Sequence, residues 1–215
     1  MTAPSLKLNL TKPGDAAPKL SLSLDKGERF KVRLAWDGDT DIDLHALVAV
    51  NTGACRSMSV SSFGDILSTY NVQRTIRGQA TGTLPLNADK TFSVHGGALV
   101  HSPDATDGLA TGDDEWVSIQ PDRLAPPAAG VIEIPLVAMI HPQGSGRSFR
   151  TVRNARVVVE NALGKELLNV SLSDQFGEFV GVQMGSIMVE ASGSSFVGVG
   201  VGFNSDFNQV LGHFS

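Results

Sequence analysis

Apolar and polar residues alternate along much of this chain, which is the pattern of β-strands with one buried face. Residues 31–36, for example, place Val32, Leu34 and Trp36 on one side of a strand. Residues 44–50 form a nearly continuous apolar run, which is typical of a central strand that is buried on both faces. The same reasoning predicts further strands at 6–10, 20–24, 116–119, 131–140, 155–160, 166–172, 179–190 and 195–203.

Turn residues separate these runs at regular intervals, which favours a sandwich over a helical fold. Asn161 and Gly164 supply the turn of a hairpin between two of the runs. Residues 52–90 are interrupted too often for more than hairpins and loops, and no helix is expected apart from a single turn at 122–124. We therefore predict an all-β fold, a β-sandwich of two mainly antiparallel sheets, as one domain over residues 1–215.

Composition excludes several classes of protein. Hydrophobic residues make up 41% of the chain, enough for a substantial core, and the net charge of −5 comes without a basic run that could follow a phosphate backbone. Nucleic acid is therefore not expected as a partner. The single cysteine, Cys55, excludes an internal disulfide and predicts a reducing, cytoplasmic setting. Because no apolar run approaches about 20 residues, no membrane span is expected, and residues 1–10 lack the pattern of a secretory signal.

The acidic residues are unevenly distributed. Of the 22 Asp and Glu, four lie within residues 37–43 and five within 104–115. Carboxylates packed this closely repel one another, and a bound Ca²⁺, which takes six to eight oxygen ligands, would relieve the repulsion. Solvated turns are the alternative, because Asp and Gly are also common turn residues. An EF-hand is excluded, since the loop counted from Asp37 has Ile42 and Val48 where Gly and Glu are required.

An ordered series of motifs runs along the chain, from Leu34 to Asp37 and Asp41 to Ala46 to the acidic loop from Asp104 to Glu115. It continues through residues 149–155, 164–167 and 172–174 to the closing stretch at 198–203. This series resembles that of TerD-like proteins. The segment from about 55 to 96 is the exception, because it is longer than the corresponding family region and reads as a divergent insertion.

The resemblance implies a calcium-binding β-sandwich in which the two acidic loops meet at one end. It assigns the ligand role to eight acids: Asp37, Asp41, Asp43, Asp104, Asp107, Asp113, Asp114 and Glu115. His45 and Thr111 stand where the family has acids, so one strong site and one weakened or lost site are expected, for one or two Ca²⁺ ions. Asp107 adds a carboxylate that compensates in part.

The resemblance also implies a function in tellurite resistance and bacterial stress. We expect a non-enzymatic binding or scaffold module that acts through protein partners or self-assembly, because no serine or histidine lies in a recognisable catalytic pattern. The alternative is a structural subunit of a larger assembly such as a phage particle, which would place the protein in a virion. An enzyme that uses the metal as a Lewis acid on a small anion is the third hypothesis.

Overall fold

The computed structural model describes residues 21–24, 27, 29–53, 62–125, 127–144 and 146–214. The strand predicted at 6–10 and the single cysteine, Cys55, lie outside these residues. The other predicted strands are all present, and that at 20–24 corresponds to the first strand, β1 (Ser21–Leu24).

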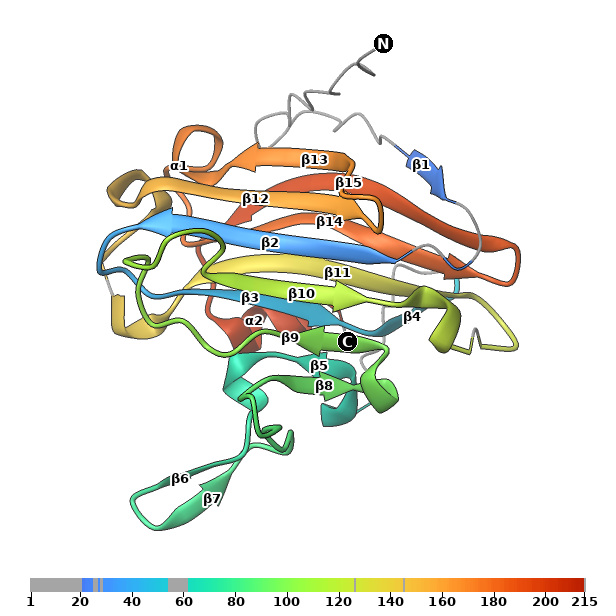
Figure 1. Ribbon diagram of the computed structural model, residues 1–215, viewed down its shortest axis with the longest axis horizontal. Helices are drawn as coiled ribbons and strands as arrows, with labels where there is room; N and C mark the ends of the chain where they lie inside the picture. Colours follow the sequence, from blue (N-terminus) through green and yellow to red (C-terminus); the bar gives the residue numbers. More distant parts are fainter. Residues whose placement is uncertain are drawn as a thin grey trace.

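Two antiparallel sheets stack into a sandwich, as the sequence predicted (Figure 1). The larger sheet has the order β1, β15 (Gly193–Phe203), β14 (Gly181–Glu190), β11 (Val131–Ile140), β3 (Ile42–Leu47) and β5 (Ile66–Leu67), and β4 (Ala49–Asn51) also pairs with β11. The smaller sheet has the order β13 (Glu166–Ser171), β12 (Arg153–Asn161), β2 (Phe30–Asp37), β10 (Glu115–Ile119), β9 (Leu99–His101) and β8 (Phe92–Val94).

The hydrophobic core fills the space between the sheets. The alternating strand β2 buries Val32, Leu34 and Trp36 there, as its pattern predicted. Strand β3 is buried on both faces because a second apolar cluster covers the outer face of the larger sheet. That cluster consists of Leu47, Ile66, Val137, Met139, Phe207, Val210 and Phe214.

The expectation that the chain has no helix was wrong. Helix α2 (Phe207–Gly212) supplies part of the covering cluster, and a single turn, α1 (Leu172–Gln175), follows β13. Asp206 caps α2 in a capping box with Gln209, which is a signal that the sequence carries. The turn expected at 122–124 is a 3₁₀ turn at Pro121–Arg123. Among the described residues, no helix combines the length and apolar character needed to cross a bilayer.

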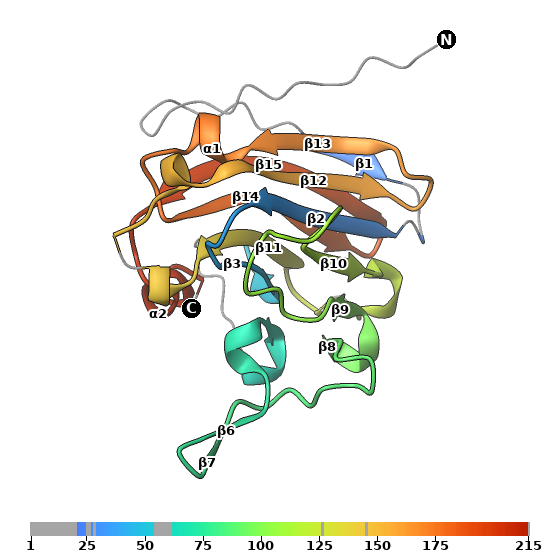
Figure 2. The same cartoon turned by 60° about the vertical axis from the view of Figure 1, so that its left-hand side comes forward.

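The predicted insertion contains the most exposed element of the fold. Its described part begins with 3₁₀ turns at Phe63–Asp65 and Thr69–Asn71 and continues into a hairpin of β6 (Arg74–Ile76) and β7 (Gln79–Thr81). Figures 1 and 2 show this hairpin extending away from the sandwich. Further 3₁₀ turns lie at His95–Gly97, Pro142–Gly144 and Phe149–Thr151.

Candidate metal centre

Three of the predicted ligand residues converge at one end of the sandwich. One oxygen from each of Asp43, Asp104 and Glu115 lies within 4.8 Å of the others. Asp43 lies on β3 of the larger sheet, Glu115 begins β10 of the smaller sheet, and Asp104 lies in the loop between β9 and β10. The fold therefore brings acids from both sheets to one point, although they are far apart in sequence.

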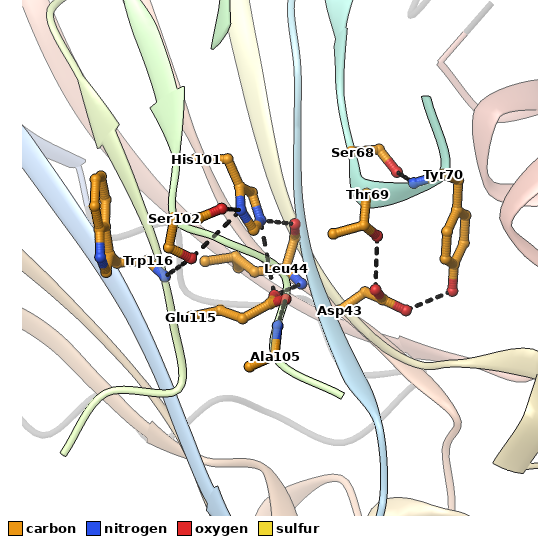
Figure 3. Close-up of polar contacts among 10 residues, drawn as sticks. All are labelled: Asp43, Leu44, Ser68, Thr69, Tyr70, His101, Ser102, Ala105, Glu115 and Trp116. Carbon is orange, nitrogen blue, oxygen red and sulfur yellow. Dashed lines mark hydrogen bonds and ion pairs between the residues drawn. The ribbon is translucent and has the colours of Figure 1, made fainter. Parts of the chain in front are cut away.

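Glu115 is the most deeply buried of the three. It lies on the core-facing side of β10, in line with Val117 and Ile119, and its side chain is 0% exposed. Its carboxylate accepts the backbone N–H of Leu44 at 2.7 Å and that of Ala105 at 3.4 Å (Figure 3). Burial raises the pKa of Glu115 well above its usual value, and the nearby Asp43 raises it further. The carboxylate is therefore a costly buried charge unless a cation neutralises it.

Asp43 is held by side chains from the segment that the sequence left undefined. The hydroxyl groups of Thr69 and Tyr70 donate to its two oxygens at 2.6 and 2.7 Å, on the side of β3 that faces away from Glu115 (Figure 3). Burial raises the pKa of Asp43, while these hydrogen bonds act in the opposite direction. Each carboxylate oxygen retains a second lone pair, so these bonds leave Asp43 able to bind a cation.

Asp41 adds a fourth carboxylate beside this triad. Its Oδ1 atom is buried and has no hydrogen-bond partner within the described part of the chain, and the Nδ1 atom of His141 lies 3.8 Å from its Oδ2 atom. Burial is the main cause that raises its pKa to about 7, followed by the charges of Asp43 and Asp104. A buried, unpartnered carboxylate oxygen is costly unless something else binds it. The residues therefore fit a hard cation with oxygen ligands.

A second, looser group contains three more of the predicted acids. Asp114 accepts the backbone N–H of Trp36 at 2.9 Å, and its other oxygen is buried without a partner among the described residues. Burial raises its pKa, and the charges of Asp107 and Asp37 add to the shift. Asp37 also accepts a hydrogen bond from the side chain of Asn154, and Asp107 accepts the backbone N–H of Leu109.

Asp113, the eighth predicted ligand residue, is engaged elsewhere. It forms ion pairs with Arg33 at 3.0 Å and Lys31 at 3.6 Å, both on the outward-facing side of β2. Three consecutive acids, Asp113 to Glu115, therefore separate: one pairs with arginine and lysine, one joins the looser group, and Glu115 enters the core. The structure does not bring Asp113 into the triad.

Several residues that shape the site gave no usable signal in the sequence. Thr69 and Tyr70 lie in the segment predicted to be an insertion, where the sequence analysis found no family motif. His101, the last residue of β9, is fully buried, and its Nε2 atom lies 2.8 Å from the carbonyl oxygen of Leu44. His45 packs against the ring of Phe207 at 4.5 Å, and burial lowers its pKa to about 3.

The fold and the site together define an all-β sandwich with an acidic triad, two of its members buried, that could hold a metal ion. The chain belongs to the TerD family: the TerD domain profile matches residues 90–214, more than half of the sequence. It is 33% identical over 104 residues to the tellurium resistance protein TerZ of Serratia marcescens, an alignment that covers 48% of this chain. The match spans 50% of the length of this relative.

Solved structures share the fold over most of the chain. A homologue of telluride resistance protein (TerD) from Streptomyces coelicolor A3(2) superposes with a TM-score of 0.62 at 20% identity, covering 87% of this chain and 95% of its own. A crystal structure of a protein of unknown function gives a TM-score of 0.61 at 16% identity, with coverage of 86% and 95%. At these identities the likeness establishes the fold alone.

Proposed function

We propose that this protein is a calcium-binding, non-enzymatic module that serves in tellurium resistance or a related stress response. The observation that supports calcium binding is the convergence of Asp43, Asp104 and Glu115, two of them buried, with the unpartnered Asp41 oxygen beside them. The stress-related setting rests on family membership and on the described role of the Serratia relative.

The donor set favours a hard cation such as Ca²⁺ over zinc. All the converging ligands are carboxylate oxygens, which suit a hard cation, whereas zinc prefers nitrogen and sulfur donors. Asp41, Asp43, Asp104 and Glu115 would hold the ion, and water or backbone oxygens would complete a shell of six to eight ligands. When bound, the ion supplies positive charge that neutralises the buried carboxylates and cross-links the two sheets.

The surroundings of the acids support a binding role. The N–H groups of Leu44 and Ala105 fix Glu115, and the hydroxyls of Thr69 and Tyr70 fix Asp43. Carboxylates held in place before the ion arrives lose little conformational freedom on binding, which raises affinity. We assign this group the higher affinity, and the looser group of Asp37, Asp107 and Asp114 a lower one.

Calcium is expected to raise the melting temperature of chelator-treated protein by about 5–10 °C at a concentration about 100 times Kd. A ligand that binds only the folded state at this excess adds about 2.7 kcal/mol, and a chain of this size gains about 2–4 °C per kcal/mol. Differential scanning calorimetry would measure the shift. Asp43→Asn should remove it, whereas Asp122→Asn, in an exposed turn at residues 121–123, should retain it. An unchanged melting temperature in the presence of calcium would contradict the proposal.

A further inference from the structure

An open pocket lies directly against the candidate calcium centre. Its volume is about 350 Å³, within the range of about 300–1,000 Å³ that is usual for small-ligand sites. An ion with a few water molecules would occupy only part of this space, since a water molecule takes about 30 Å³ of liquid volume. The pocket therefore has room for a small molecule in contact with the ion.

The walls of the pocket carry charges of both signs. The acids on it are Asp39, Asp41, Asp43 and Asp104, and the bases are Arg74 and Arg147. Together with Glu115, which the proposed calcium site also uses, five carboxylates and two guanidinium groups give a net charge of −3. Without a cation, the pocket would repel an anion. One Ca²⁺ ion would reduce this net charge to −1, and at short range the ion would be the positive group nearest the open space.

Both arginines retain hydrogen-bond donors for a ligand. Arg74 donates to the backbone carbonyl of Thr69 at 2.8 Å. Arg147 donates to Asp39 and to the hydroxyl of Thr40, at 3.0 and 2.6 Å. These contacts fix the direction of each guanidinium group, which has five N–H donors in total. Pre-oriented guanidinium groups are well suited to bind phosphate oxygens in pairs.

We infer that the pocket binds a phosphate monoester group in a calcium-dependent manner, an inference that rests on the proposed calcium site. With an ion bound, three positive groups would line the open space: the ion, Arg74 and Arg147. A phosphate monoester has three terminal oxygens, one for each partner, whereas a carboxylate has only two. The calcium ion supplies the charge that makes the pocket accept the anion, and the two arginines select the ligand by its number of oxygens.

The inference predicts that a phosphate ester and calcium strengthen each other's binding. Calcium affinity would be measured at buffered free calcium with and without sn-glycerol 3-phosphate, and the ester is expected to raise it about tenfold. Because coupling between two sites is reciprocal, the ester should bind calcium-loaded protein more tightly than chelator-treated protein by the same factor. Acetate should produce a much smaller effect. Vesicles of phosphatidylcholine with and without phosphatidic acid would show whether a lipid headgroup can supply the phosphate.

Arginine variants distinguish this inference from the calcium proposal itself. Arg74→Gln and Arg147→Gln should bind calcium at least as tightly as the unmodified protein but lose the effect of the ester. Arg77→Gln, at the tip of the same hairpin as Arg74, is the matched control and should keep it. Normal calcium binding with no response to the ester or to phosphatidic acid would overturn the inference and leave the calcium site standing. A response retained in both pocket variants would also overturn it. Absence of calcium binding would refute the proposed function.

Discussion

Glu115→Gln is expected to lower calcium affinity about 100-fold or more while the protein remains folded. Glu115 is the most deeply buried member of the triad. Of the three acids, it is the one that lies on a strand of the smaller sheet. A glutamine oxygen can still accept the N–H of Leu44, so the variant loses the charge and only the longer contact with the N–H of Ala105. Loss of one carboxylate charge from a buried site is expected to cost about 3 kcal/mol of binding, which corresponds to about 100-fold.

Calorimetric titration with calcium would measure this loss, and thermal unfolding would show that the variant is folded. Without calcium, the variant should be at least as stable as the unmodified protein, because it no longer buries a carboxyl group whose ionised form is disfavoured. Asp122→Asn serves as the charge-matched control away from the site. Full calcium affinity in the Glu115→Gln variant would show that the acidic triad is not the binding site.

Asp41→Asn is expected to stabilise the calcium-free protein near neutral pH while weakening its affinity for calcium. The pKa of Asp41 is about 7 in the folded chain and near 4 when unfolded, so between these values the folded state binds more protons. The contribution of Asp41 to the free energy of unfolding therefore falls as pH rises through 7, because the carboxyl group must then ionise close to other acids. The asparagine variant avoids this loss and should therefore have a free energy of unfolding higher by on the order of 1–2 kcal/mol at pH 7.5. This value is discounted because solvent reaches part of the side chain.

Urea unfolding of both proteins, without calcium, at pH 7.5 and pH 5.5 would test this expectation. The advantage of the variant should shrink at the lower pH, where Asp41 is already protonated. The comparison between proteins is needed because His45 and His101 act with the opposite sign: burial lowers their pKa, so their contribution to stability is lost as pH falls. This loss is common to both proteins and cancels. An equal advantage at both pH values would refute the assignment to Asp41.

The strand pattern was predictable because each strand has a solvent-facing side or a continuous apolar run. The strand predicted at 131–140 is β11, and the turn from Asn161 to Gly164 joins β12 to β13. Helix α2 was missed because its six residues are too few to show a helical period, although its capping box is legible. The hairpin of β6 and β7 has no buried face, so its boundaries could not be read from hydrophobicity.

The candidate site was predictable in composition but not in detail. The two acidic loops do meet, since Gly38 and Gly108 pair through their backbones, but sequence spacing cannot tell which acids point inward. The turn of the chain before β10 decides this: Glu115 enters the core, and Asp113 reaches Arg33. Contacts from Thr69 and Tyr70 depend on the tertiary packing of the segment that contains them, which no local sequence pattern encodes.

The most direct test of the central claim is a calcium titration by isothermal calorimetry on chelator-treated, unmodified protein. We predict saturable binding with one high-affinity ion per chain, held at Asp43, Asp104 and Glu115, and a weaker second ion at most. Magnesium at the same concentration should bind more weakly, because it gives up its hydration water reluctantly and demands near-ideal octahedral geometry. No saturable calcium binding up to millimolar concentration would contradict the account.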